Sequence, residues 1–203
     1  MIYAVTNRNL VEGGEPVFLK QIEKIAAARP DGIILREKDL QPLDYELLAK
    51  KCQVLCNAYE TPLIINHFHE VSQKIFNRRI HLSMAVFKEL AQRPEGIGKW
   101  KCLGVSVHSR EEALYAEEIG ADYVIAGHIF LTDCKKGLAA RGLDFLKEIC
   151  DSVNIPVFAI GGMDLVHGPM ALEAGAAGIC MMSELMKSTC PEEIIKRFSG
   201  RSL

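Results

Sequence analysis

The residues best suited to chemistry gather in residues 126–137, which read AGHIFLTDCKKG. This stretch follows an apolar run over residues 123–126 that predicts a buried strand. It contains His128 and the adjacent lysines Lys135 and Lys136 before a closing glycine. A histidine can take up and return a proton near neutral pH, and a lysine can bind an anion. We therefore expect His128 to be an acid and base acting on an anionic substrate. The structural alternative is a hydrogen-bonded wall residue.

The two lysines are neighbours in the sequence, so their side chains should point in different directions. We assign Lys136 to the substrate, although the sequence does not distinguish it from Lys135. Thr132, earlier in the same stretch, is a further candidate for substrate binding.

Eight short apolar runs alternate with helical patterns along the chain. The runs cover residues 2–6, 32–35, 62–65, 80–82, 103–107, 123–126, 156–160 and 178–182. Apolar residues at helical spacing predict helices over residues 17–28, 43–58, 71–76, 110–119 and 143–152, a short one before Gly175, and closing helices from Ser183 and Pro191. Ser109 and Glu112 form a capping-box pattern, and Gly120 is a fitting end for that helix.

The runs are continuously apolar, as expected for parallel strands with both faces covered. Eight such strands with helical crossovers predict an α/β protein with a closed (β/α)8 TIM barrel. A doubly wound open sheet is the alternative. The length of 203 residues suits a single domain over residues 1–203.

Polar side chains follow several predicted strands, where the site of such a barrel lies. The candidates for substrate binding outside the 126–137 stretch are Arg36, Lys38, Asn66, Ser106 and His108. Gly161 and Gly162 have the backbone freedom to turn their amides toward an anion, and Met182 and Ser183 begin a short helix after the last strand. Loops after the seventh and eighth strands often bind phosphate in barrels, so these four residues form the predicted phosphate site.

Composition excludes several classes of function. The formal charge of −2 gives no case for nucleic acid or an anionic membrane, and no apolar run approaches the length of a spanning helix. No secretory signal is visible, and the seven scattered cysteines include no C-x-x-C pair, which predicts reduced thiols in the cytoplasm.

His67 and His69 form an H-x-H pair after the third strand. We interpret them as polar rim residues and expect no catalytic metal.

Several motifs together resemble the thiamine phosphate synthase/TenI superfamily over nearly the whole chain. They are LREKD at residues 35–39, IIN at 64–66, LGVSVHS at 103–109, GADY at 120–123, GHIFLT at 127–132 and AIGGM at 159–163. The resemblance implies a (β/α)8 barrel. It also implies one of two activities, which differ in whether a metal is needed.

Thiamine phosphate synthases bind a pyrimidine pyrophosphate with Mg²⁺ and join it to a thiazole phosphate. Where the family has a metal-binding aspartate after the third strand, this chain has His67, and where it has Gly-Gln-x-Asp after the fourth, residues 83–86 read SMAV. The family's glutamine on the second strand is Ile34 here. Because Mg²⁺ needs oxygen ligands, the loss of both carboxylates argues against a synthase.

Residues 127–137 are instead similar to the TenI thiazole tautomerases, in which the matching histidine moves a proton. We therefore expect an isomerase that aromatises a carboxythiazole phosphate in thiamine biosynthesis, with a small phosphorylated thiazole as substrate and no cofactor. Arg36 and Lys38 would neutralise the substrate carboxylate. Two alternatives are a thiamine phosphate synthase, which would need Mg²⁺, and a non-catalytic regulatory protein that binds thiazole or thiamine phosphates. The sequence leaves a homo-oligomer open.

Overall fold

The computed structural model describes residues 1–132, 137 and 139–198 of the chain. In this part, eight parallel strands follow one another in the order β1 to β8 of a closed barrel. The strands are β1 (Ile2–Val5), β2 (Gly32–Leu35), β3 (Leu63–Asn66), β4 (Arg79–Ser83), β5 (Cys102–Val107), β6 (Tyr123–Gly127), β7 (Val157–Ile160) and β8 (Gly178–Met181). The predicted (β/α)8 TIM barrel is confirmed.

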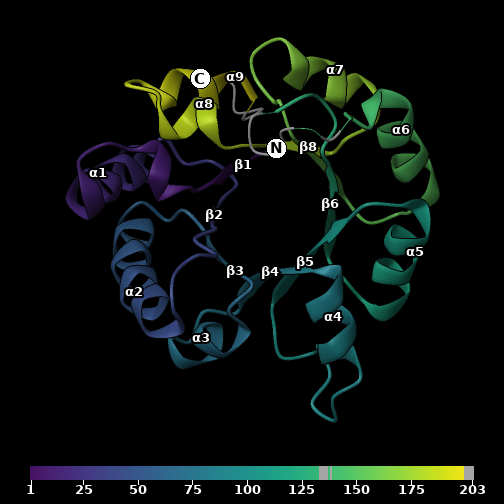
Figure 1. Ribbon diagram of the computed structural model, residues 1–203, viewed down its shortest axis with the longest axis horizontal. Helices are drawn as coiled ribbons and strands as arrows, with labels where there is room; N and C mark the ends of the chain where they lie inside the picture. The colour runs from purple at the N-terminus through teal and green to yellow at the C-terminus, as the bar shows by residue number, and fades with distance from the viewer. Residues whose placement is uncertain (133–136, 138, 199–203) are drawn as a thin grey trace. The chain divides into compact units, whose positions relative to one another are not determined.

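Helices alternate with these strands, as Figure 1 shows. They are the 3₁₀ helix η1 (Arg8–Leu10) and the α-helices α1 (Gly14–Ala27), α2 (Pro42–Ala58), α3 (His69–Lys74), α4 (Met84–Ala91), α5 (Arg110–Ile119), α6 (Gly142–Ser152), α7 (His167–Glu173), α8 (Ser183–Met186) and α9 (Pro191–Phe198). None of the helices in the described ranges is long and apolar enough to cross a membrane.

The contacts divide the chain into two compact units, each of which is described by itself. The first unit contains residues 1–79 and the described residues from 181 onward, and the second contains residues 80–180. Whether the chain acts as the single domain expected for residues 1–203 stays a prediction.

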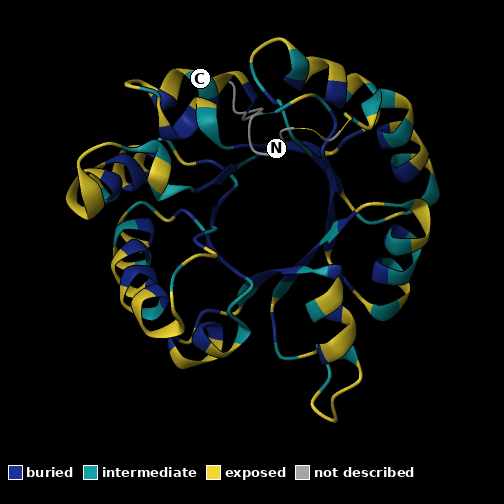
Figure 2. Ribbon diagram, viewed as in Figure 1, coloured by how far each residue is buried: buried dark blue, intermediate teal, exposed yellow. Residues whose placement is uncertain are grey.

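In the first unit, β1 pairs with β2 and β2 pairs with β3, all in parallel register. Every residue of β2 and β3 is buried, because helices cover strands that are apolar on both faces except for Asn66 at the end of β3. Helix α1 buries residues at helical spacing, including Phe18, Ile22 and Ile25, while its other face meets solvent, as the colours of Figure 2 show. The Gln21 amide donates hydrogen bonds to the carbonyls of Leu185 and Ser188, which joins α1 to α8.

In the second unit, β5, β6, β7 and β8 pair in sequence order, with Val105 opposite Val124 and Ile125 opposite Phe158. The predicted cap of α5 is confirmed, since the Ser109 hydroxyl accepts a hydrogen bond from the Glu112 amide at 3.2 Å. The Glu112 carboxylate in turn accepts one from the His108 amide at 2.7 Å.

The sequence analysis missed α4 and η1. Met84, Phe87 and Leu90 are buried along α4 at a helical spacing of three, so the signal was present in the sequence. This helix begins at Met84, directly after β4, which ends at Ser83.

Candidate active site

The carboxyl ends of β1 and β2 in the first unit are joined through a buried carboxylate. Glu37, which is 2% exposed, accepts hydrogen bonds from the Thr6 hydroxyl at 2.6 Å and from the Arg8 amide at 3.1 Å. The Arg8 guanidinium is 3.2 Å from the same carboxylate. The Thr6 hydroxyl also accepts a hydrogen bond from the Arg36 amide at 2.9 Å. Glu37 therefore fixes the backbone from which Arg36 projects.

Sequence reasoning missed Thr6, Arg8 and Glu37 as members of this arrangement. Glu37 lies between two residues that were predicted to bind substrate, so its place at a strand end was visible. Its partners lie about 30 residues earlier in the chain, and no sequence pattern links them to it.

The Arg8 guanidinium also forms two hydrogen bonds with the Asp39 carboxylate, at 2.7 and 2.6 Å. Hydrogen bonding from this cation lowers the pKa of Asp39 from its ordinary value of 3.8 to about 2. The pair lies at the surface, with the Asp39 side chain 55% exposed. Solvent screening therefore limits its contribution to stability.

We expect this pair to make the protein less stable in acid. Because the pKa of Asp39 is lower in the folded chain, its contribution is complete above pH 4 and is lost as the pH falls toward 2. The loss should be below about 1 kcal/mol, since exposed ion pairs contribute little. Urea unfolding between pH 5 and pH 2 should show a shallower loss of stability for Asp39→Asn than for wild type. The same slope in both would contradict the assignment, and Asp151→Asn, an exposed carboxylate on α6, is the control.

A buried tyrosine holds the ends of β2 and β3 together. The Tyr45 hydroxyl donates a hydrogen bond to the Leu35 carbonyl at 2.6 Å and accepts one from the Asn66 amide at 3.1 Å. Burial raises the pKa of Tyr45, so the hydroxyl stays protonated. Asn66, a predicted substrate-binding residue, is only 6% exposed and is placed by this contact.

The structure brings Lys38 and His67 near each other at the ends of the paired strands β2 and β3. His67 has a left-handed backbone with φ of 70°. Burial, and secondly the positive charge of Lys38, lowers the pKa of His67, which favours a neutral imidazole. Arg36, Lys38, Asn66 and His67 thus belong to one edge of the first unit.

In the second unit, a histidine and an arginine join the ends of β5 and β6. The Nδ1 atom of His108 is 2.9 Å from the carbonyl oxygen of Gly127. A carbonyl only accepts, so Nδ1 carries the hydrogen and Nε2 is the nitrogen left for other contacts. The Arg141 guanidinium donates to the His108 carbonyl at 2.6 Å, and the Arg141 amide donates to the His128 carbonyl at 3.1 Å. Sequence reasoning missed Arg141.

Ser106 and His81 form a second polar pair in this unit. Their Oγ and Nε2 atoms are 2.8 Å apart, and the imidazole stacks on Tyr123 with ring centres 5.6 Å apart. His81 is 3% exposed and was not among the predicted site residues. The Ser106 hydroxyl is therefore already engaged by a buried histidine.

The Gly161–Gly162 turn packs directly on the backbone around His128. The amides of Ile129 and Phe130 donate to the carbonyls of Ile160 and Gly161 at 2.9 and 3.0 Å. Both glycines have positive φ, 102° and 66°. A Cβ atom on Gly161 would lie 2.5 Å from the Cβ of His128, which is only 6% exposed. Only glycine fits this approach, so the turn and His128 position each other.

The other predicted site residues lie apart from this turn or outside the description. Thr132 is half-buried, and Lys136 lies outside the described residues. Met182 and Ser183 begin α8 in the first unit, whereas Gly161 and Gly162 belong to the second. A phosphate site built from both pairs stays a prediction.

The described residues do not fit a magnesium site. They contain no group of three or more histidine, cysteine, aspartate or glutamate side chains that could hold a metal ion. Glu37, the carboxylate directly after β2, is already occupied by Thr6 and Arg8. Mg²⁺ requires several oxygen ligands, and the described residues do not bring such a set together.

A sequence model described as thiamine monophosphate synthase (TMP-TENI) matches residues 2–185. The chain belongs to this family. The thiamine-phosphate synthase of Clostridium acetobutylicum is 35% identical over 187 residues, which cover 92% of this chain and 87% of that protein. That of Clostridium tetani is 32% identical over 196 residues, or 94% and 92% of the two chains. The thiamine phosphate pyrophosphorylase structure from Pyrococcus furiosus has a TM-score of 0.79 at 27% identity, covering 96% of this chain and 91% of the other.

These relatives confirm the superfamily and correct the expected reaction. The isomerase prediction, a thiazole tautomerase, was wrong, because the relatives at 32–35% identity are thiamine-phosphate synthases. That prediction gave too much weight to the missing carboxylates and to the resemblance of residues 127–137 to the tautomerases. The proton-transfer role of His128 was inferred for that reaction, and the place of His128 in the site stays a prediction.

Proposed function

We propose that the chain is a thiamine phosphate synthase, a transferase that joins a pyrimidine pyrophosphate to a thiazole phosphate. The observation that carries the proposal is the 32–35% identity to thiamine-phosphate synthases over more than nine tenths of this chain. In this reaction the bond between the pyrimidine methylene carbon and the pyrophosphate oxygen breaks, and its electrons leave with pyrophosphate. The thiazole nitrogen supplies the electron pair of the new C–N bond.

This chemistry needs anion binding more than acid or base catalysis, because no proton is gained or lost in the coupling. In the first unit we assign Arg36 and Lys38, at the end of β2, to substrate anions, with Asn66 beside them on β3. Cations at this position would stabilise the charge that develops on the leaving group.

In the second unit we assign the backbone amides of Gly161 and Gly162 to a phosphate, since both glycines adopt the positive φ that such a turn requires. His128 is given a packing role behind the turn. The candidates for contacts with the substrate rings remain Ser106, His108, Thr132 and Lys136. The further candidates for the phosphate remain Met182 and Ser183 of the first unit. Binding of a small phosphorylated thiazole, a cytoplasmic location and the oligomeric state stay predictions.

A second candidate is a non-catalytic protein that binds thiazole or thiamine phosphates. The observation that favours it is the lack of a carboxylate cluster for Mg²⁺ in the described part of the chain. Such a protein would still bind phosphate at the Gly161–Gly162 turn but would have no catalytic activity.

We expect purified chain to form thiamine phosphate from the two substrates, detected by oxidation of the product to fluorescent thiochrome. The assay should be run with Mg²⁺ and, separately, with a chelator. Arg36→Ala should reduce kcat/KM by about 10²-fold or more if the arginine stabilises the transition state. The control is Arg93→Ala, which removes an exposed arginine that pairs with Glu89 on α4. Tight substrate binding with no product under either condition would favour the non-catalytic candidate.

A further inference from the structure

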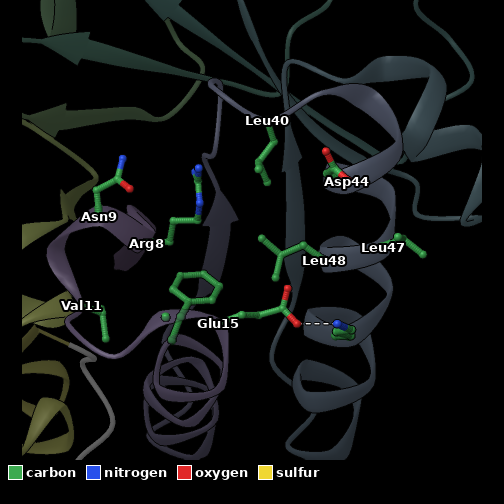
Figure 3. A pocket seen from close by; sticks show the side chains of 11 residues that line it. Arg8, Asn9, Val11, Glu15, Leu40, Asp44, Leu47 and Leu48 are labelled. Carbon is green, nitrogen blue, oxygen red and sulfur yellow. Dashed lines mark hydrogen bonds and ion pairs between the residues drawn. The ribbon is translucent and has the colours of Figure 1, made fainter.

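A cavity of about 480 Å³ lies in the first unit between α1 and α2. Figure 3 shows Leu40 and Leu48 pointing into it from the α2 side, with Arg8 and Val11 across from them. Its lining residues come from the segment after β1, from α1, from the segment after β2 and from α2. They are Arg8, Asn9, Val11, Gly14, Glu15, Phe18, Leu40, Asp44, Leu47, Leu48 and Lys51. Of these residues only Arg8 belongs to the network around Glu37, and none is assigned to the proposed coupling.

Apolar side chains form one part of the walls of this cavity, and charged or polar side chains form the rest. Leu40, Leu48 and Phe18 line it, and Leu47, 51% exposed, stands at its edge. A volume of this size is typical of pockets for small organic molecules, in which apolar walls hold a ring and a few polar groups fix its orientation. The apolar part of the walls can therefore hold an organic ring.

The charges around the cavity favour a cation. Arg8 is bound by Glu37 and Asp39, so two carboxylates compensate its charge. Lys51 forms an ion pair with Glu15, as the dashed line in Figure 3 shows. Asp44 is exposed, and in the described part of the chain its carboxylate has neither an ion pair nor a hydrogen bond. The lining thus offers one carboxylate that lacks a side-chain partner, in the first turn of α2 and beside an apolar wall.

We propose that this cavity binds a flat organic cation. The ring packs against Leu40 and Leu48, and the positive charge faces the Asp44 carboxylate. Burial of the ring supplies most of the binding energy, and the carboxylate selects a cation over a neutral ring of the same shape. The inference does not depend on coupling activity, because none of these residues is assigned to that reaction.

The test uses N-methylquinolinium as the flat cation and quinoline, which is neutral near physiological pH, as the comparison of similar ring shape. Each is titrated against the full chain by equilibrium dialysis. N-methylquinolinium should bind about 3- to 5-fold more weakly to Asp44→Asn than to wild type, because an exposed carboxylate contributes at most about 1 kcal/mol. The matched control is Asp144→Asn, because Asp144 is the third residue of α6 just as Asp44 is the third residue of α2. This control should bind N-methylquinolinium as wild type does, and both variants should unfold near the wild-type temperature.

Localisation is tested by methyl NMR, in which the leucine resonances of the cavity should shift on addition of N-methylquinolinium and stay unshifted when pyrophosphate is added instead. The inference is overturned if N-methylquinolinium does not bind, if Asp44→Asn binds it as tightly as wild type, or if quinoline binds equally well. Coupling activity of Asp44→Asn should match wild type, so failure of this inference is distinguishable from failure of the proposed function.

Discussion

Replacing Gly161 by alanine should lower the free energy of unfolding by about 2–5 kcal/mol and abolish most coupling activity. The new Cβ would lie 2.5 Å from the Cβ and 2.9 Å from the Cα of His128, and 3.2 Å from the Ile129 amide nitrogen. Neither backbone atom can move without breaking the hydrogen bonds that join Ile129 and Phe130 to the carbonyls of Ile160 and Gly161. The turn assigned to phosphate would therefore be displaced.

Gly142→Ala is the matched control for this variant. Gly142 also has a positive φ, 82°, but a Cβ there would meet nothing within 4 Å. In Gly142→Ala the free energy of unfolding should fall by about 1–2 kcal/mol, which is the cost of placing alanine in a left-handed backbone conformation. Coupling activity should be kept. Urea unfolding and the thiochrome assay measure both effects. Equal losses for the two variants would show that the close approach to His128 is not what requires glycine at position 161.

Replacing Glu37 by alanine should cost about 2–4 kcal/mol of stability and weaken substrate binding. The change leaves the buried Thr6 hydroxyl and the Arg8 amide without their shared acceptor. It also removes one of the two carboxylates that compensate Arg8. Because Thr6 in turn accepts from the Arg36 amide, the end of β2 should loosen, and KM should rise more than kcat falls.

Asp39→Ala tests whether the losses expected for Glu37→Ala arise because the Glu37 carboxylate is buried. Asp39 binds the same arginine from the surface, so its loss should cost less than about 1 kcal/mol. The loss of stability in Glu37→Gln should lie between those of Asp39→Ala and Glu37→Ala, since the amide oxygen still accepts a hydrogen bond but carries no charge. If Asp39→Ala proves as harmful as Glu37→Ala, the buried network does not organise this edge of the unit.

Much of the fold could be predicted because the signals are local. β2 and β3 are unbroken apolar runs, and the cap of α5 depends on Ser109, Glu112 and Gly120, which lie close in the sequence. Helix α4 was missed although Met84 and Phe87 had the right spacing. Contacts between distant residues were not predictable, and the Glu37 network joins residues about 30 positions apart.

The reaction was harder to predict than the fold. The resemblance found in the sequence left two activities open. The choice between them depended on two carboxylates that this chain lacks, one at His67 and one in residues 83–86. The absence of a metal ligand concerns only one requirement of the synthase reaction. The identity to the synthases is measured over nearly the whole chain and is therefore stronger evidence for the reaction. The acid and base role of His128 stays a prediction, because it was inferred from one stretch and no observation tests the residue itself.

The most direct test of the central claim is a ³¹P NMR time course with both substrates and catalytic amounts of the chain. The account predicts that the signals of the pyrimidine pyrophosphate decline while free pyrophosphate and thiamine phosphate appear in equal amounts. Gly142→Ala should behave similarly, and Gly161→Ala should be nearly inactive. If the substrate signals persist unchanged although both compounds bind, the chain is not a thiamine phosphate synthase and the non-catalytic binding protein is the better account.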